Sequence, residues 1–533
     1  MVQKKSRREF LGKACKLAIV GGGGFVTACG FVTTQRGAVD TRLENSTPLD
    51  SSGERAGLYY QTREGNLGDP IPFFWQGRYH IFHVGSGEWG HIVSDDLLRW
   101  EKLPVAIARG GPGEPDSSQC ASGSIIERDG TFHIFYLGRH DKDGRRVGTV
   151  CHATSDDLIH WRKNPRNPLL TPDYENYAGV TKDPFVFWNE EEQRYWMLIS
   201  DRLRHAPTSR TGVLALAVSS DLENWERRPE PFWAPDSSTC EFEVPDLFEW
   251  NGRYYLTYTT YMEATGTYYR VAERASGPWL APAVDSFDDQ LYYAGKVLHA
   301  GQRHLAFAFV RSGEAGEHIP ASDRRQALII REVLQKPDGS LAFKPPEEFL
   351  RACGPEIAVK ETSRLGQWSQ HDHGWHGERL DGLAYSVAEN FRANCLLNLT
   401  ITLKPNTRSA GVLFRTTPNL ERGYMLRLDP AHNRVVFERW PKSWPWKSEF
   451  WRNVAAARGQ QPFMVQRSVH PSQFSWEEPI RIQLFFHDTI AEVFVQDELA
   501  LVTRTYDHRD GDFALFVEHG AADFTELTLK PLP

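Results

Sequence analysis

The sequence has few cysteines, no long basic run and no long helical pattern, and each absence excludes a class of protein. Seven cysteines among 533 residues are too few and too scattered for a disulfide framework. A formal net charge of -8, with no long basic run after the first few residues, argues against nucleic acid as a partner. The histidines are scattered without metal-ligand spacing, so the sequence predicts no metal site and no cofactor.

Aromatic residues, in contrast, are plentiful. The chain contains 17 Trp, 18 Tyr and 30 Phe, and its 24% of charged residues is typical of a globular protein. Aromatic rings suit carbohydrate binding, because the C–H faces of sugars pack on them, but an aromatic-rich β core explains the composition equally well. The cysteines beyond residue 29 are predicted to be mostly buried small hydrophobes: Cys120, Cys151, Cys240, Cys353 and Cys395.

Residues 1–29 have the features of an export signal. A twin arginine, Arg7-Arg8, followed by Phe-Leu, resembles the signal that moves folded proteins across the bacterial inner membrane. The apolar stretch that follows is too short for a transmembrane helix and ends in Val-Thr-Ala-Cys, which looks like a lipobox. Cys29 is therefore the predicted lipidation site, with a plain cleaved signal as the alternative. Residues 30–55 form a tether, and we expect a periplasmic or cell-surface protein that meets the membrane only through this lipid anchor.

A repeated segment indicates the architecture of the next 300 residues. The pattern Ser-x-Asp-Leu-x-x-Trp recurs at 94–100, 155–161 and 219–225. Alternating aromatic and aliphatic runs precede each copy, and two more such runs follow. Because units of roughly 50–60 residues with several short strands are typical of a β-propeller, the sequence predicts an all-β fold with five blades over residues 56–355.

After about residue 370 the repeat stops, but strand patterns continue. Short alternating segments separated by turn residues predict a β-sandwich over residues 370–533. A Trp-rich insertion interrupts these segments, and we favour a loop packed by its own rings over a sugar-binding face. The tryptophans of this insertion are Trp440, Trp444, Trp446, Trp451 and Trp476.

Acidic residues open three of the strands predicted to line the propeller channel. Asp69 lies in Gly-Asp-Pro, Asp183 in Lys-Asp-Pro and Glu243 in Glu-Val-Pro-Asp. Acids that open an apolar strand are costly to bury without a use. Since the innermost strands of a propeller converge near its axis, we expect the three acids to meet at one mouth of the channel. For the stretch around Glu243 taken alone, a solvated turn is the alternative.

Three carboxylates at one place suit the cleavage of a glycosidic bond. This reaction needs a proton donor for the leaving oxygen and a carboxylate that attacks the anomeric carbon or activates water. Glu243, flanked by apolar residues and facing two aspartates, suits the general acid. Asp69, beside a bare glycine backbone, is expected to be accessible and ionised, as a nucleophile requires. Asp183 then binds sugar hydroxyls and stabilises charge in the transition state.

These motifs resemble glycoside hydrolase family 32, the invertase, inulinase and levanase family. Residues 89–104 look like its Trp-Gly-His segment with Trp-Glu-x-Leu-Pro, residues 182–184 like its Arg-Asp-Pro, and residues 243–248 like its Glu-Cys-Pro-Asp-Leu-Phe. The resemblance covers roughly residues 57–533. It implies a β-fructofuranosidase that retains anomeric configuration, with Asp69 as nucleophile, Glu243 as acid/base and Asp183 as stabiliser, and with about 5–5.5 Å between nucleophile and acid.

The resemblance also implies a sugar-binding shell, in which several positions depart from the family pattern. Lys182 replaces an arginine and loses its bidentate fork, His83 stands where the family has Gln, and Ala121 replaces an aromatic residue. A non-standard furanoside or a distinct fructan therefore enters consideration as the oligo- or polysaccharide substrate. The candidate substrate-binding residues are Gly68, His83, Trp89, Ser122, Lys182, Asp246 and Lys296.

Two other functions fit the same sequence. One is an inverting five-bladed glycosidase that resembles family 43 and acts on arabinosides or xylosides, although the terminal sandwich fits it less well. The other is a surface lipoprotein that binds glycans without cleaving them, which the altered sugar-binding shell motivates.

Overall fold

The computed structural model describes residues 57–62, 67–204, 211–235, 239–260, 265–310, 326–371, 374–389, 391–441, 464–506 and 508–533. The predicted signal with Cys29, the predicted tether, and Trp444, Trp446 and Trp451 lie outside these residues. In the described part, the only α-helix is α1 (Glu347–Arg351), and no helix is long and apolar enough to cross a membrane.

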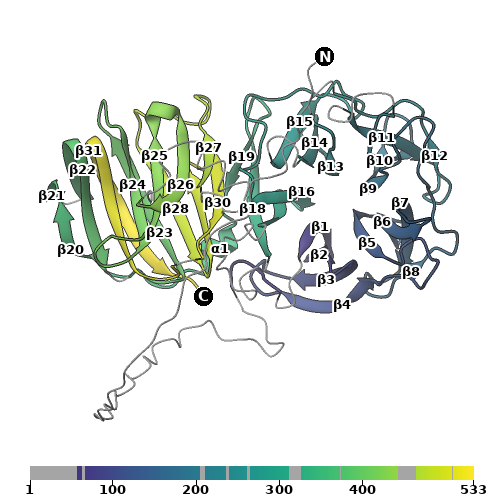
Figure 1. Ribbon diagram of the computed structural model, residues 1–533, viewed down its shortest axis with the longest axis horizontal. Coiled ribbons are helices and arrows are strands. Elements are labelled where there is room, and N and C mark those ends of the chain that lie inside the picture. Colours follow the sequence, from purple (N-terminus) through teal and green to yellow (C-terminus); the bar gives the residue numbers. More distant parts are fainter. Residues whose placement is uncertain are drawn as a thin grey trace, which may run out of the picture. The chain divides into compact units, whose positions relative to one another are not determined.

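Five antiparallel sheets, each consecutive in the chain, form a ring of blades (Figure 1). Four blades have four strands, and blade four has three strands whose outer edge is extended by the isolated bridges Val271–Leu280 and Tyr268–Ser286. The predicted five-bladed propeller is thus confirmed. Its strands are β1 (Gly68–Trp75), β2 (Arg78–Gly85), β3 (Glu88–Ser94), β4 (Glu101–Ile107), β5 (Gln119–Arg128), β6 (Thr131–Lys142), β7 (Arg145–Ser155), β8 (Arg162–Lys163), β9 (Lys182–Asn189), β10 (Arg194–Arg202), β11 (Gly212–Ser219), β12 (Glu226–Arg227), β13 (Glu243–Trp250), β14 (Arg253–Thr260), β15 (Gly266–Ala272), β16 (Tyr292–Ala300), β17 (Arg303–Val310), β18 (Ala327–Gln335) and β19 (Leu341–Lys344).

The first strands of the five blades, β1, β5, β9, β13 and β16, surround the centre of the ring (Figure 1). Each contacts the first strand of the next blade, and β16 contacts β1, so the ring is closed. Because side chains alternate across a strand, each blade can pack apolar residues against both neighbours. Buried clusters accordingly join blades one and two, two and three, and three and four.

The repeated Ser-x-Asp-Leu segment is a turn between the third and fourth strands of a blade. In blade one, Ser94 Oγ accepts the N–H of Leu97 at 2.9 Å, and Asp96 Oδ1 accepts the N–H of Arg99 at 2.8 Å. These side chains satisfy backbone donors that the turn leaves unpaired. The leucine has positive φ in all three copies, at 62° for Leu97 and 66° for Leu158 and Leu222, so the repeat encodes one turn geometry.

The segment before blade one pairs with blade five. Gln61 forms an antiparallel bridge with Ala327, and the N–H of Leu328 donates to the carbonyl of Tyr60 at 2.9 Å. The chain ahead of the first blade therefore ties the first blade to the last.

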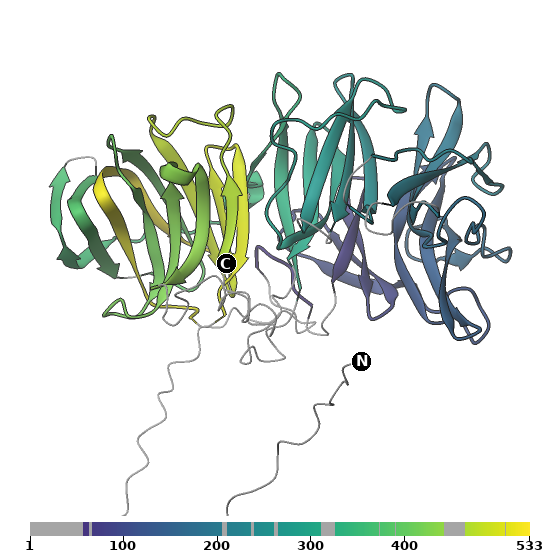
Figure 2. The same ribbon diagram turned by 45° about the horizontal axis from the view of Figure 1, so that its top comes forward.

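The C-terminal domain is built of strands that form one continuous, strongly curved sheet (Figures 1 and 2). The long strand β31 pairs with β22, β23 and β24 and so connects the layers, which confirms the predicted sandwich. The domain begins at Lys360, ten residues before the predicted boundary, because β20 pairs with β22. Its strands are β20 (Lys360–Leu365), β21 (Gln367–His371), β22 (Gly374–Glu389), β23 (Cys395–Leu403), β24 (Ser409–Thr416), β25 (Gly423–Asp429), β26 (Arg434–Trp440), β27 (Met464–Ser468), β28 (Ile480–His487), β29 (Ile490–Val495), β30 (Leu499–Arg504) and β31 (Asp512–Pro531), with the 3₁₀ turn η3 (Pro430–His432).

The propeller and the sandwich share a buried cluster of charges. Arg331 of β18 bonds to Asp288 and, at 2.7 Å, to Glu492 of β29, and all three side chains are almost fully enclosed. The hydroxyl of Tyr59 donates to Glu492 at 2.6 Å. Separating the two domains would leave buried charges of this cluster without their partners, so the cluster favours their contact.

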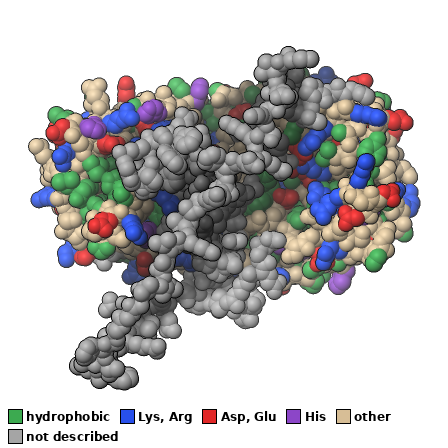
Figure 3. All heavy atoms as spheres, in the orientation of Figure 1, with side chains coloured by type: hydrophobic (Ala, Val, Ile, Leu, Met, Phe, Trp, Pro, Cys, Tyr) green, Lys and Arg blue, Asp and Glu red, His purple; other side chains and the backbone are tan. Residues whose placement is uncertain are grey.

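The cysteines have the structural role expected from the sequence. All five described cysteines are free, and all except the partly buried Cys353 are buried. His91 and His152 each form a 3.0 Å hydrogen bond with a histidine of the neighbouring strand, His80 and His133 respectively. On the face seen in Figure 3, basic and acidic side chains are interspersed.

Candidate active site

All five innermost strands carry a β-bulge at the point where the predicted site residues lie. In β1 the pairing passes from Gly68–Val84 to Ile71–Phe82, so Asp69 and Pro70 together oppose the single residue His83. Equivalent irregularities occur in β9, β13 and β16. Proline suits a bulge because it has no N–H to lose from the ladder, and bulges re-aim side chains next to active sites.

The bulges hold non-glycine residues in the left-handed backbone region. The φ angles are 42° for Asp69, 53° for Asp183, 44° for Val244 and 57° for Ala294. Such conformations cost free energy and persist where the surrounding structure enforces them, most often at functional sites. The same strained geometry recurs in four blades, which indicates that this end of the channel is a functional site.

The register of the bulges corrects one detail of the sequence interpretation. Asp69 and Asp183 are equivalent residues, each directly after the last residue paired before the bulge. Glu243 lies one position earlier, where the other blades have Gly68, Lys182 and Tyr293. Glu243 therefore approaches the site from a different height along its strand than the two aspartates do.

The three acids nevertheless influence one another. Burial, together with the nearby carboxylates of Asp183 and Glu243, raises the pKa of Asp69 to about 7, against the opposing effect of Lys296 and Lys182. Asp69 is partly exposed, as expected, but its raised pKa differs from the expectation that it remains ionised. Burial and the two neighbouring carboxylates, which the chain alone does not reveal, are the physical reason.

Lys182 lies between two glutamates. Its ammonium is 2.5 Å from Glu241 Oε2 and also pairs with Glu243 Oε1, and Arg202 pairs with the other oxygen of Glu241. Lys182 and Glu241 are buried. The lysine therefore holds the carboxylate of Glu243 in place, a role more direct than the substrate contact predicted for it.

Glu243 has a second partner on blade five. The hydroxyl of Tyr293, at the equivalent bulge position, donates to Oε2 of Glu243. Tyr293, Glu241 and Arg202 were not predicted as site residues. For two of them the only signal was position: Tyr293 lies at the start of β16, the first strand of blade five, and Glu241 shares the acidic stretch with Glu243.

Two predicted site residues connect neighbouring blades through the backbone. Asp183 Oδ2 accepts the N–H of Val244 at 3.1 Å, and Asp246 Oδ2 accepts the N–H of Val297 at 2.8 Å. Burial raises the pKa of Asp246, while nearby Lys296 lowers it. These bonds give both aspartates a role in holding the strand openings together.

Lys296 and Ser122 also belong to the site. The ammonium of Lys296 donates to the carbonyl of Pro245 at 2.9 Å, and burial lowers its pKa against the charges of Asp246, Asp183 and Asp69. Ser122 lies in the bulged opening of β5, and its buried hydroxyl has no hydrogen-bond partner in the described residues. A buried hydroxyl without a partner is costly, so it is suited to a hydroxyl of a bound ligand.

The side chains of Trp89 and His83 are buried. Trp89 is fully buried in the cluster between blades one and two, and its Nε1 donates to the carbonyl of Ala121 at 2.7 Å. The ring of His83 packs over Gly90 of β3, and burial lowers its pKa to about 4. Both residues were predicted to bind substrate, but in the structure their side chains pack against other residues of the blades. Gly68 adjoins Asp69 and has room for a Cβ, whose nearest neighbour would be Val84 O at 3.5 Å.

The fold and the site together define a class of protein, a five-bladed propeller with coupled carboxylates at the openings of its innermost strands and with a β-sandwich attached. The model of the glycosyl hydrolases family 32 N-terminal domain matches residues 59–345, and that of the family 32 C-terminal domain matches residues 373–531. The chain belongs to glycosyl hydrolase family 32, as its motifs predicted.

Known proteins of several organisms are similar to the chain. A β-fructofuranosidase of Arabidopsis thaliana, insoluble isoenzyme CWINV1, is 30% identical over 225 residues, which are 39% of this chain and 37% of the relative. Raffinose invertase of Escherichia coli is 24% identical over 504 residues, 87% and 92% of the two chains. The chain matches less than half the length of the first curated relatives.

A solved structure supports the fold. The structure of exo-inulinase from Aspergillus awamori has a TM-score of 0.68 at 18% identity and covers 90% of this chain and 98% of its own. A similarity at this identity establishes the shared architecture.

Proposed function

We propose that the protein is an exported glycosidase that hydrolyses β-fructofuranosidic bonds with retention of configuration. The observation that carries the proposal is that Asp69, Asp183 and Glu243 all lie at the bulged openings of innermost strands, and the raised pKa of Asp69 agrees with their proximity. Family membership and the names of the similar proteins, which include β-fructofuranosidases, a raffinose invertase and an exo-inulinase, supply the substrate class.

In the first step, a carboxylate oxygen of Asp69 attacks the anomeric carbon of the fructosyl unit. The bond to the leaving oxygen breaks, and Glu243 transfers its proton to that oxygen. The product is an ester between Asp69 and the sugar. The carboxylate of Asp183 stabilises the positive charge that develops on the ring in the transition state.

In the second step, water replaces the departed sugar. Glu243, now ionised, removes a proton from the water as its oxygen attacks the anomeric carbon, and the ester bond to Asp69 breaks. The sugar leaves with its original configuration, and Glu243 carries a proton again. In the structure, Lys182 and Tyr293 contact the two oxygens of Glu243 and so position its carboxyl group.

The raised pKa of Asp69 fits this scheme. With a pKa of about 7, Asp69 is only partly ionised near neutral pH. The reaction requires Asp69 to be ionised when it attacks, so the fraction of reactive enzyme increases as the pH rises through this value.

The decisive test is fructose release from sucrose, inulin and levan by the purified protein. We expect Asp69→Ala and Glu243→Ala to abolish release, whereas Asp129→Asn, an exposed aspartate in a blade-two turn, leaves it unchanged. No fructose from any of the three sugars would refute the proposed substrate class.

The retaining mechanism has its own test. With methanol as acceptor, trapping of the enzyme-bound sugar should give methyl β-fructofuranoside, which NMR identifies. The α anomer as first product would indicate inversion and would rule out the ester intermediate.

Export and anchoring through Cys29 are part of the proposal and rest on the sequence motifs alone. Expression of the full chain in a Gram-negative host with labelled palmitate should give a labelled membrane-bound protein. We expect Cys29→Ser to remove the label, and Arg7→Lys with Arg8→Lys to leave the protein in the cytoplasm. Labelling that survives Cys29→Ser would contradict the anchor.

A further inference from the structure

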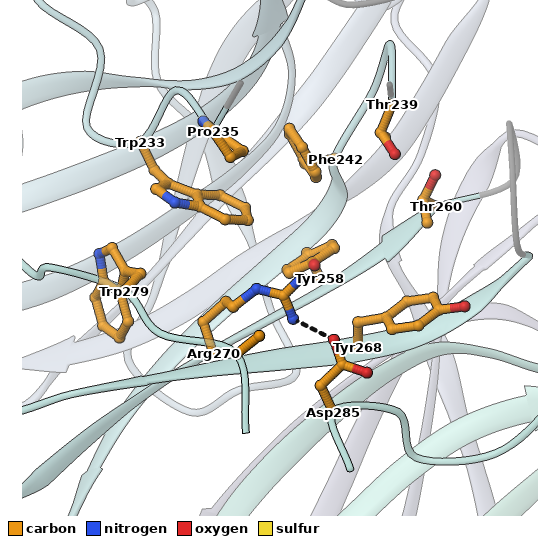
Figure 4. Close-up of a pocket in the computed structure, with 11 residues that line it drawn as sticks. Trp233, Pro235, Thr239, Phe242, Tyr258, Thr260, Tyr268, Arg270, Trp279 and Asp285 are labelled. Atoms are coloured by element: carbon orange, nitrogen blue, oxygen red, sulfur yellow. Dashed lines mark hydrogen bonds and ion pairs between the residues drawn. The ribbon is translucent and has the colours of Figure 1, made fainter. Parts of the chain in front are cut away.

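A pocket of about 410 Å³ lies beside the proposed catalytic site, between blades three and four. This volume is within the range of small-molecule binding sites. Trp233 follows blade three, Tyr258 and Tyr268 come from β14 and β15, and Trp279 comes from the outer edge of blade four (Figure 4). The proposed reaction gives the pocket no role.

Aromatic rings form one part of the lining. Trp233 lies 4.7 Å from Phe242 and 5.2 Å from Tyr258, measured between ring centroids. Trp233 and Trp279 are only partly buried, so each offers ring surface to the pocket. Exposed faces of this kind pack against the C–H groups of sugar rings.

An ion pair provides the polar part. Arg270 Nη1 donates to Asp285 Oδ2 at 2.7 Å and to the carbonyl of Tyr269 at 2.8 Å, and the guanidinium lies over Tyr258 at 5.3 Å. Among the described residues, these bonds leave the donors on Nε and Nη2 for a ligand. Figure 4 places the pair between the tryptophans and the hydroxyl side of the pocket, formed by Thr239 and Thr260.

The charges select the class of ligand. Arg270 and Asp285 neutralise each other, so the pocket has no excess charge to attract an ion. A purely apolar ligand would strip water from both groups without replacing its hydrogen bonds, at a cost in free energy. A neutral ligand with C–H faces and hydroxyl groups, such as a sugar ring, satisfies both parts of the lining.

One strand segment separates this pocket from the catalytic carboxylates. Glu241 and Glu243 bond to Lys182 on the channel side, whereas Phe242, between them, packs on Trp233 in the pocket. Side chains alternate in extended backbone, so the same short stretch presents its acids to one site and its ring to the other.

We propose that this pocket is a second sugar-binding site, which holds a fructosyl unit of an oligo- or polysaccharide while another unit occupies the carboxylate site. The inference rests on the proposed function for the identity of the sugar. A second site that binds a further sugar unit makes longer fructans better substrates than sucrose.

Fluorine NMR of the protein labelled with 5-fluorotryptophan tests the site directly. In the Glu243→Gln variant, which prevents turnover, the resonances of Trp233 and Trp279 are assigned by Trp233→Phe and Trp279→Phe. Both should shift on titration with 1-kestose and saturate. Resonances that stay fixed up to roughly 50 mM, far above a millimolar Kd, would overturn the inference.

Kinetics provide a second readout. Trp279→Ala should lower the ratio of kcat/KM for inulin to kcat/KM for sucrose about five-fold, the effect of losing one aromatic contact, and Trp279→Phe should restore most of it. Leu280→Ala, an exposed neighbour that does not line the pocket, should leave the ratio unchanged. An unchanged ratio in Trp279→Ala contradicts the second site.

The two proposals fail differently. Wild-type protein that releases fructose from 1-kestose, with no shift of the two resonances, refutes the second site and leaves the proposed function intact. Shifts of both resonances with no fructose release refute the function and support the pocket as a sugar site.

Discussion

The hydroxyl of Tyr293 donates to one oxygen of Glu243, and the ammonium of Lys182 pairs with the other. The partners come from blades five and three, on either side of the blade that carries the glutamate. The acid/base group is thus positioned from two sides by residues at equivalent places in the fold.

Replacing Tyr293 by Phe should lower kcat about ten-fold, because a catalytic group that loses one of two positioning contacts spends less time in the reactive geometry. KM for sucrose should change less, since the ring is retained. The measurement is steady-state kinetics on sucrose. An unaltered kcat would mean that the hydroxyl does not position the acid.

Replacing Lys182 by Met should destabilise the protein by about 3 kcal/mol, because Glu241 and Glu243 then lose the cation between them. Activity should fall with it. Urea denaturation measures the free energy of unfolding. Arg274→Met, which removes an exposed ion pair with Glu191, is the control and should cost less than about 1 kcal/mol.

The raised pKa of Asp69 predicts a pH dependence of both activity and stability. Asp69 must be ionised to attack, so kcat/KM should rise with pH through about 7. In the unfolded chain this group ionises near pH 3.8, so between these values the folded state binds more protons, and stability falls as pH rises. Asp69→Asn should therefore raise Tm at pH 8.

A difference of about three pKa units corresponds to about 4 kcal/mol as the upper limit of that gain. The gain should vanish below about pH 3, where the folded and the unfolded wild type both hold the proton. Calorimetry of Asp69→Asn and wild type at the two pH values provides the comparison. If Asp69→Asn and the wild type have the same Tm at pH 8, folding does not raise the pKa of Asp69.

Arg331→Met should destabilise the junction of the two domains by about 3–5 kcal/mol, because Asp288 and Glu492 remain buried without their cation. Thermal unfolding should then separate into two transitions. If the triple variant with Asp288→Asn and Glu492→Gln does not recover part of the loss, the cost lies in packing instead of charge.

The sequence predicted the five blades because the first three blades repeat a turn whose Ser and Asp side chains bond to the backbone, and two further strand-like runs follow. It also predicted the three acids, since each stands beside a proline-containing strand opening. Their register was not predictable, because a bulge is defined by the partner strand, and this moved Glu243 by one position.

The prediction for Trp89 was wrong for a related reason. A tryptophan in a family motif can bind sugar or support the strand that does, and the choice depends on which side of β3 it occupies. Lys182 was predicted to contact substrate, but its pairing with Glu241 depends on a contact between blades that no local pattern reveals.

The short segment ahead of blade one has a consequence for biosynthesis. Tyr60 and Gln61 pair with β18, and Tyr59 donates to Glu492, more than four hundred residues later in the chain. During translation, Tyr59 is therefore made long before its partner Glu492. The ring can assemble blade by blade as it emerges from the ribosome and can close when β18 has been made, but the bond of Tyr59 forms only after the sandwich strand β29 has been made. In a truncated chain that ends after the propeller, Tyr59 and Arg331 would both lack their partner Glu492.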